Sequence, residues 1–264
     1  MKVAILAGGL GTRLQEETVV RPKPMVEIGG RPILWHIMKH FSHYEFNDFY
    51  IAAGHLGNQI KQYFLDCLYL SGHITIDFKA KSVERDHIDA EQWLVNVIDT
   101  GPQTNTGGRL KRLRSRLGDE PFLLTYGDGV SNVNLLELVD FHQRSGRMVT
   151  VTAVRPPARF GGLQLNGDIV ENFTEKPVIG EGWINGGYMV CEPSLFDFLT
   201  NDGTSLEHHA LEAIADAGQL AAFRHDGFWQ CMDTLRDKTY LQNLWDSEQA
   251  PWNVWSGESM TRKD

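Results

Sequence analysis

A glycine-rich stretch, AGGLGTR, follows a short apolar run near the start of the chain. The apolar run, residues 3–6, predicts a strand that is buried on both faces of a sheet. The three glycines of the stretch are Gly8, Gly9 and Gly11. They let backbone N–H groups approach a ligand closely, and Arg13 and Lys23 add two cations nearby. A strand, an NH-rich loop and two cations together predict a cradle for a polyphosphate.

The spacing of this stretch differs from the two best-known phosphate loops. The P-loop pattern ends in GK[ST], whereas Gly11 is followed here by Thr12 and Arg13. The dinucleotide-binding pattern needs a third glycine or alanine where this chain has Leu14, which disfavours an NAD(P)-dependent enzyme. Spacing alone also leaves open that the glycines form only a tight turn.

Two aspartates are candidate ligands for a divalent cation. Asp128 lies between two glycines after the buried strand predicted at residues 121–126, at the edge where open α/β sheets bind ligands. Asp233 lies in a turn rich in aromatic residues. Each has an alternative role, since Asp128 could cap a turn and Asp233 could be the N-cap of a helix beginning near Thr234.

The strings LAGGLGTRL and PKPMVEIGGRPIL together resemble the signature of the sugar-1-phosphate nucleotidylyltransferases. The EET after the loop and VEIGGRPILWHIM are most similar to the branch of that family that uses CTP and α-D-glucose 1-phosphate. The resemblance continues through GDG and EKP to FWQCMDTLRDK. It implies in-line attack of the sugar phosphate on the α-phosphorus of CTP, assisted by Mg²⁺, which gives CDP-glucose and pyrophosphate.

The resemblance also implies roles for individual residues. The implied catalytic residues are Arg13 and Lys23, and the implied Mg²⁺ ligands are Asp128 and Asp233. The implied nucleotide-binding residues are Leu6, Ala7, Gly8, Gly9, Gly11, Thr12, Arg13, Lys23, Thr104, Thr106, Arg109 and Asp128. The implied sugar-phosphate-binding residues are Gly127, Glu175, Lys176, Asn185 and Gly186. Without the resemblance, Glu175 and Lys176 indicate a solvated surface, and residues 104–109 a loop and the start of a helix.

Two other functions stay open beside this one. The same family pattern fits a uridylyl- or thymidylyltransferase that acts on another sugar 1-phosphate, because no residue is identified that distinguishes cytosine. A nucleotide-sugar sensor that has lost catalysis is disfavoured, because the charged residues of the site are all present. These are Arg13, Lys23, Asp128, Lys176 and Asp233.

Strands and helices alternate along most of the chain, which predicts an α/β fold. We expect a Rossmann-like, mostly parallel central sheet flanked by helices, with a smaller sugar-binding region rich in β-hairpins. One domain, 1–264, is expected, with a nucleotide-binding core at 1–155 and a sugar-phosphate-binding and C-terminal portion at 156–264. Strands are predicted at 3–6, 48–54, 73–78, 95–100, 121–126 and 147–154, and a hairpin at the sheet's edge at 160–177. Helices are predicted at 32–41, 58–70, 107–117 and 135–144.

Composition restricts the kinds of partner that the protein is expected to bind. A net charge of −9 argues against non-specific binding to nucleic acid, and most of the basic run at 109–116 is expected to be a solvated helix face. No apolar run is long enough to span a membrane, and three scattered cysteines fit a reducing compartment, so a cytoplasmic protein is expected. The family resemblance implies a homo-oligomer, a hexamer, and the charged segment 79–97 is either a solvated excursion or a subunit contact.

Overall fold

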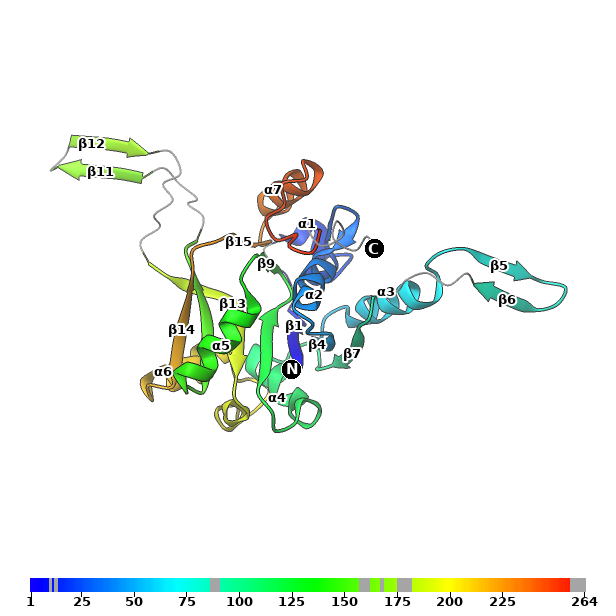
Figure 1. Cartoon of the computed structure of the whole chain (residues 1–264), viewed down its shortest axis with the longest axis horizontal. Coiled ribbons are helices and arrows are strands. Elements are labelled where there is room, and N and C mark those ends of the chain that lie inside the picture. The colour runs from blue at the N-terminus through cyan, green and yellow to red at the C-terminus, as the bar shows by residue number, and fades with distance from the viewer. Residues whose placement is uncertain are drawn as a thin grey trace, which may run out of the picture.

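The computed structural model describes residues 1–9, 11, 14–85, 91–156, 162–166, 169–174 and 182–256. Within them a seven-stranded sheet has the order β14-β10-β13-β8-β1-β4-β7 (Figure 1). Strand β13 is antiparallel to both of its neighbours, and the other neighbouring pairs are parallel. The strands are β1 (Val3–Ala7), β4 (Asp48–Ala53), β7 (Leu94–Asp99), β8 (Phe122–Tyr126), β10 (Val149–Val154), β13 (Ile184–Cys191) and β14 (Leu220–His225). The predicted mostly parallel α/β sheet is therefore confirmed.

Helices cover both faces of the sheet because successive side chains of each strand point to opposite sides. Ile5 of β1 packs in one core, whereas Leu6 packs in the other. The helices around the first core are α2 (Ile33–His43), α3 (Gly57–Tyr69), α5 (Leu135–Ser145) and α7 (Leu235–Asp246). Those around the second are α4 (Thr106–Leu117), the 3₁₀ helix η3 (Pro193–Phe198), the π-helix η4 (Leu206–Leu211) and α6 (Glu212–Asp216).

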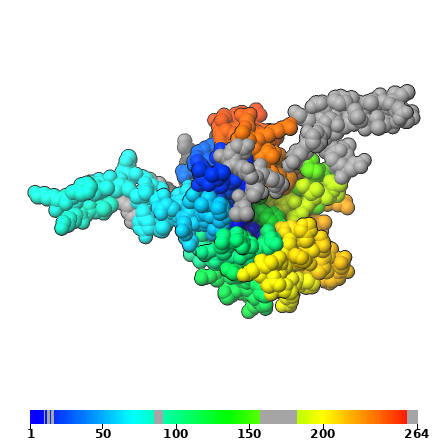
Figure 2. Space-filling model, turned by 180° about the vertical axis from the view of Figure 1, so that it is seen from behind, coloured from blue at the N-terminus to red at the C-terminus, as the bar shows by residue number. Residues whose placement is uncertain are grey.

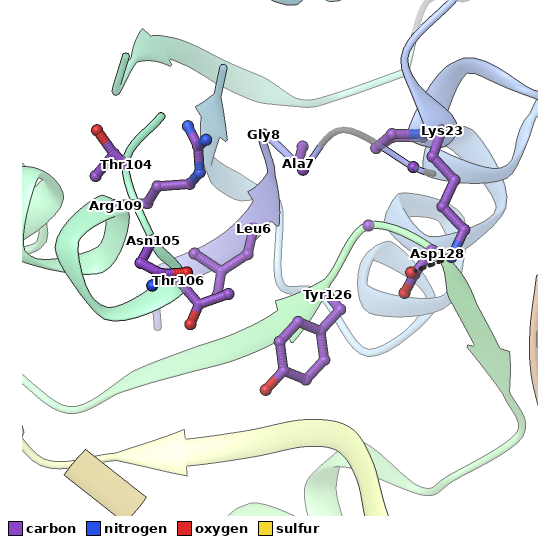
Figure 3. A pocket seen from close by; sticks show the side chains of 14 residues that line it. Leu6, Ala7, Gly8, Lys23, Thr104, Asn105, Thr106, Arg109, Tyr126 and Asp128 are labelled. Carbon is purple, nitrogen blue, oxygen red and sulfur yellow. Dashed lines mark hydrogen bonds and ion pairs between the residues drawn. The ribbon is translucent and has the colours of Figure 1, made fainter. Parts of the chain in front are cut away.

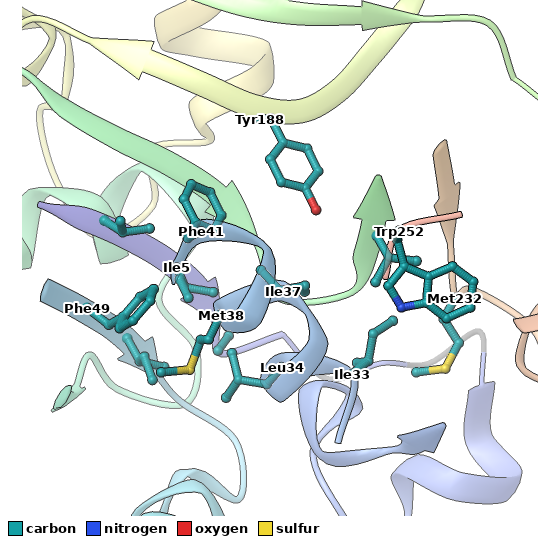
Figure 4. Packing of buried hydrophobic residues seen from close by; sticks show 14 of the residues in the cluster. Ile5, Ile33, Leu34, Ile37, Met38, Phe41, Phe49, Tyr188, Met232 and Trp252 are labelled. Carbon is teal, nitrogen blue, oxygen red and sulfur yellow. The ribbon is translucent and has the colours of Figure 1, made fainter. Parts of the chain in front are cut away.

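Helix α2 shows how sequence periodicity builds the first core. Ile33, Ile37 and Phe41 are spaced four residues apart, so they lie on one face of the helix and are fully buried (Figure 4). Phe41 stacks on Tyr188 of β13, with ring centroids 5.7 Å apart. Each such side chain contributes roughly 1.5–3 kcal/mol through burial.

Short elements complete the described chain. Near the N-terminus these are α1 (Gln15–Thr18), the 3₁₀ helix η2 (Lys23–Met25) and the paired strands β2 (Glu27–Ile28) and β3 (Arg31–Pro32). Strand β9 (Gly129–Ser131) pairs with β15 (Trp229–Cys231), although about a hundred residues separate them in the sequence. None of the helices in the described ranges is both long and apolar enough to cross a membrane.

The strand predicted at residues 73–78 does not join the central sheet. Residues Ile74–Asp77 form β5, which pairs with β6 (Ser82–Arg85) in a hairpin that projects from the end of α3 (Figures 1 and 2). The next strand of the sheet is β7 instead. The alternation of strands and helices predicted a third strand of the sheet here, but the Ile76 side chain is 55% exposed. The segment 79–97 therefore contains a strand of the hairpin and the start of β7, and its residues 86–90 lie outside the described chain.

The hairpin predicted at residues 160–177 is present as β11 (Gly162–Asn166) and β12 (Ile169–Thr174). These two strands form a sheet of their own instead of extending the edge of the central sheet. The predicted hairpin is confirmed, but its predicted position at the edge of the central sheet is wrong. Alternation of apolar and polar residues predicts a strand without specifying the strand it pairs with.

A cluster of aromatic rings holds residues after α7 against α2. The Trp252 indole N–H donates to Nδ1 of the buried His36 at 3.3 Å, and Nε2–H of His36 donates to the Ile28 carbonyl at 2.8 Å. Gly29 has a φ of +59°, and a Cβ on it would clash with the Trp245 indole. The imidazole of His36 must stay neutral to accept from Trp252.

Protonation of buried histidines should destabilise the fold below about pH 6.5. Burial lowers the pKa of His36 to about 4 and that of His40 to about 3, so below the unfolded-state pKa of about 6.5 the unfolded chain binds protons that the native state cannot. Each histidine should remove about 1.4 kcal/mol of unfolding free energy per pH unit between pH 6.5 and its native pKa. Urea unfolding at pH 7, 6 and 5 measures this loss.

The variant His36→Gln keeps an amide donor toward Ile28 but does not titrate. Its unfolding free energy should fall less steeply with decreasing pH than that of the natural protein, and the difference in slope should equal the contribution of one histidine. Equal slopes for the two proteins would contradict the lowered pKa of His36.

Candidate active site

A cavity of about 330 Å³ opens beside the carboxyl ends of β1 and β8 (Figure 3). The two strands are parallel neighbours, so their carboxyl ends meet at one edge of the sheet. The predicted site residues that line the cavity are Leu6, Ala7, Gly8, Gly9, Gly11, Lys23, Thr104, Thr106, Arg109, Gly127 and Asp128. Pro24, Asn105 and Tyr126 also line it and were not predicted. The fold thus brings together segments that are about a hundred residues apart in the sequence.

Two further predicted residues, Asn185 and Gly186, lie at the start of β13 and do not line this cavity. The next residue, Gly187, packs against the ring of Tyr126, and Tyr126 lines the cavity. The Gly186 carbonyl accepts from the Trp229 indole at 2.7 Å. Four predicted residues lie outside the described chain, so their roles stay predictions. They are Thr12, Arg13, Glu175 and Lys176.

Lys23 joins the two predicted metal ligands. Its Nζ lies 2.7 Å from Oδ2 of Asp128 and 2.5 Å from Oδ1 of Asp233. The side chains of Lys23 and Asp233 are each only 10% exposed. Burial by itself lowers the pKa of Lys23, but Asp128 and Asp233 outweigh it and raise the pKa above its ordinary value. Lys23 is therefore a charged ammonium held between two carboxylates.

Backbone pairing between distant segments positions these carboxylates. In the β9–β15 ladder Gly129 is opposite Cys231, and the Met232 N–H donates to the Asp128 carbonyl at 2.8 Å. The turns that carry the two aspartates are thereby hydrogen-bonded to each other. The lysine is fixed by η2, which begins directly after Pro22.

The alternative role of Asp233 as a helix cap is wrong. Thr234 is the N-cap of α7, and its side chain accepts from the N–H of Asp237. The Asp237 carboxylate accepts in return from the N–H of Thr234 at 2.9 Å, which completes a capping box. The carboxylate of Asp233 is consequently available to Lys23.

The two aspartates suit a hard divalent cation. Their oxygens converge on one ammonium, and Mg²⁺ prefers one or two carboxylates together with water and phosphate oxygens. In the described part of the chain no group of three or more His, Cys, Asp or Glu side chains forms a closed metal cage. Burial and the nearby Asp233 raise the pKa of the Cys231 thiol to about 12, so this neighbour stays protonated and is a poor ligand.

Arg109 is a buried cation in the cavity wall, so it is the exception in a basic run of which most was expected to be a solvated helix face. Its side chain donates to Oγ1 of Thr100 at 2.8 Å and to the Gly101 carbonyl at 2.7 Å. A Cβ on either Gly8 or Gly54 would clash with the guanidinium. Burial, reinforced by the charge of Arg112, lowers the pKa of Arg109 from its ordinary value. The two glycines therefore make room for the arginine.

Gly107 and Gly108, which precede Arg109, allow close packing of α4. Gly108 donates its N–H to the Thr204 carbonyl at 3.1 Å. A Cβ on Gly107 would lie 2.8 Å from that same carbonyl oxygen. The pair lets the first turn of α4 dock closely on residues 202–204, which fixes the wall that carries Thr104, Thr106 and Arg109.

Comparisons with known proteins agree with this geometry. Residues 2–237 match the family model described as nucleotidyl transferase. The chain belongs to the nucleotidyl transferase family. It is 49% identical over 256 residues to the glucose-1-phosphate cytidylyltransferase of Salmonella typhimurium, covering 97% of this chain and 100% of the relative. It is 30% identical over 272 residues to the mannose-1-phosphate guanylyltransferase catalytic subunit beta of Danio rerio, covering 97% of this chain and 69% of that one.

Solved structures show the same fold at lower identity. The structure of HddC from Yersinia pseudotuberculosis complexed with GMP-PN aligns with a TM-score of 0.67 and 20% sequence identity. The alignment covers 92% of this chain and 99% of that one. The mixed sheet with helices on both faces is thus a fold that this chain shares with a solved structure.

Gly54→Ala tests the role of Arg109 without adding an atom to a residue that lines the cavity. The new Cβ would displace the guanidinium from Thr100 and Gly101, and lost hydrogen bonds of a charged group cost about 1.5–3 kcal/mol each. Nucleotide affinity, measured by calorimetric titration, should fall about tenfold or more. Arg116→Ala, which removes an exposed arginine at the far end of the same helix, is the control. Unchanged affinity in Gly54→Ala would show that Arg109 does not contribute to binding.

Proposed function

We propose that the protein transfers a cytidylyl group from CTP to α-D-glucose 1-phosphate and produces CDP-glucose and pyrophosphate. The observation that carries the proposal is the 49% identity, over 97% of the chain, to a relative named glucose-1-phosphate cytidylyltransferase. The cavity supports it, since glycine N–H groups, Lys23 and an acidic pair suit a substrate with several phosphates.

The triphosphate end of the nucleotide is proposed to bind at the loop after β1. The N–H groups of Gly8, Gly9 and Gly11 are suited to phosphate oxygens, and all three glycines line the cavity. Arg13 is proposed to stabilise the departing pyrophosphate. Thr104, Thr106 and Arg109 also line the cavity and are proposed to face the base.

Asp128 and Asp233 are proposed to hold Mg²⁺. When bound, the ion neutralises phosphate charge. Lys23 lies against the same carboxylates and is close enough to offset the repulsion between two anionic substrates. The attacking phosphate oxygen is already ionised, so the reaction needs no general base. Glu175 is proposed to bind the sugar hydroxyls and Lys176 the sugar phosphate, with Gly127, Asn185 and Gly186 beside them.

We also propose that the protein is a homo-oligomer, a hexamer, as in the family it resembles. The support is a set of exposed apolar side chains at the end of α3 and on the β5–β6 hairpin. They are Leu68, Tyr69, Leu70, Ile76, Phe78 and Val83, of which Phe78 is 87% exposed. Apolar side chains gathered on a projecting arm are typical of a surface that contacts another protein.

A panel of nucleoside triphosphates against a panel of sugar 1-phosphates tests the proposed reaction. Pyrophosphate release in the presence of Mg²⁺ should be fastest with CTP and α-D-glucose 1-phosphate. A higher kcat/KM with UTP or dTTP, or with another sugar 1-phosphate, would show that those compounds are the substrates instead. No release with any pair would indicate a nucleotide-sugar sensor.

Asp128→Asn should lower kcat by about 10²–10³-fold, because the amide keeps the shape of the side chain but loses the charge that attracts the cation. The variant should also need more Mg²⁺ for half-maximal activity. Asp197→Asn, which changes an exposed carboxylate outside the site, is the matched control. Near-normal turnover of Asp128→Asn would contradict a role in metal binding.

A further inference from the structure

Glu207 is a half-buried acid that accepts hydrogen bonds from three hydroxyl groups. Its Oε2 accepts from Oγ1 of Thr106 at 2.7 Å and from Oγ of Ser205 at 2.8 Å. Its Oε1 accepts from the Tyr126 hydroxyl at 2.6 Å. We call Glu207, Thr106, Ser205 and Tyr126 the Glu207 cluster. It joins α4, β8 and the start of η4, which are far apart in the sequence.

The cluster requires an ionised carboxylate. All three hydroxyls donate, and an ionised carboxylate is an acceptor only. Burial alone would raise the pKa of Glu207, but the hydrogen bonds from Tyr126 and Thr106 outweigh it and hold the pKa below its usual range. Short hydrogen bonds to an ionised acceptor are about twice as strong as neutral ones, so the cluster fixes its members firmly.

One end of the cluster fixes the wall proposed to face the nucleotide base. Thr106 is the first residue of α4 and lines the cavity. Its Oγ1 donates to Glu207 and also accepts from the Leu206 N–H at 2.9 Å, so the hydroxyl is held from two sides. The neighbouring Asn105 N–H donates to the Asp202 carbonyl at 2.8 Å. The segment that carries Glu207 thus supports the whole first turn of α4.

The other end fixes the wall proposed to face the sugar phosphate. Tyr126 is the last residue of β8, lines the cavity, and precedes Asp128 by two residues (Figure 3). Its ring packs on Gly187, where a Cβ would lie only 2.7 Å from the ring carbon Cδ2. Gly187 has a φ of +84° and directly follows Asn185 and Gly186. The Tyr126 ring therefore packs directly on the start of β13, next to Asn185 and Gly186.

We propose that Glu207 is a positioning residue for both substrates. Its carboxylate holds Thr106 and Tyr126 at a fixed separation, so one side chain sets the width of the site between the base and the sugar phosphate. Glu207 acts through these two residues and does not itself line the cavity. The identity of the two substrates rests on the proposed function, whereas the geometry of the cluster does not.

Steady-state kinetics of Glu207→Ala and Glu207→Gln test this role. Glu207→Ala should raise KM for CTP and KM for glucose 1-phosphate by about tenfold or more each, because a hydrogen bond to a charged group contributes about 1.5–3 kcal/mol. Its kcat should change less than threefold. Glu207→Gln keeps the shape but offers one acceptor oxygen to three donor hydroxyls, so it should recover only part of the loss in KM. Glu192→Ala, which removes the carboxylate that pairs with buried His142, is the matched control and should leave both KM values unchanged.

Two further variants separate the ends of the cluster. Thr106→Val should raise KM for CTP alone, and Tyr126→Phe should raise KM for glucose 1-phosphate alone. A purely structural role of Glu207 would lower the melting temperature and the fraction of active enzyme with both KM values unchanged, and that result would overturn the proposal. An effect of Glu207→Ala on only one KM would overturn it as well.

The two proposals fail in distinguishable ways. If the natural protein releases no pyrophosphate from CTP and glucose 1-phosphate, the proposed function fails. The Kd of CTP and of glucose 1-phosphate, measured by calorimetric titration with natural protein and Glu207→Ala, then tests the positioning role. Ligands that bind the two proteins equally, or that bind neither, would overturn it.

Discussion

The buried ammonium of Lys23 is the interaction on which the site depends. It holds carboxylates from residues that lie 105 and 210 positions further along the chain. Two negative charges in a largely buried position would repel each other strongly, and the positive charge between them makes their proximity tolerable. Removing one partner of a buried ion pair costs about 3–5 kcal/mol, because the remaining charge stays desolvated. The short helix η2 contains Lys23, and the paired strands β9 and β15 lie next to Asp128 and Asp233. These elements hold the three residues in place.

Much of the sheet could be predicted from the sequence because its central strands are buried. A continuous apolar run such as residues 3–7 has few alternatives to a central strand, and the glycine after it marks where the strand ends. The β5–β6 hairpin could not be placed in the same way. Its alternation of apolar and polar residues is a local property, whereas membership of the central sheet depends on pairing with β4, which β7 takes instead.

The position of a site residue could be predicted where it follows from the end of a strand, as for Asp128, which lines the cavity. A residue's part in the site could not be predicted where a neighbouring residue could take the same structural role. The sequence alone could not decide whether Asp233 caps α7, and the structure gives that role to Thr234 and Asp237. Arg109 lies in a run of basic residues that resembles a solvated helix face, and only the glycines of two distant loops show that it is buried. Glu207 gave no signal, because its three partners come from separate segments.

The arrangement of the acidic pair has a consequence for biosynthesis. During translation the glycine loop, Lys23 and Asp128 emerge first, yet Asp233 must close a loop of 210 residues to reach the lysine. Closing a flexible loop of that length costs roughly 5 kcal/mol of entropy, which the completed sheet and the β9–β15 pairing must offset. A nascent chain that ends before Asp233 therefore carries most of the cavity wall without the second carboxylate. A contact of such long sequence separation thus forms only after the C-terminal third has left the ribosome and folded.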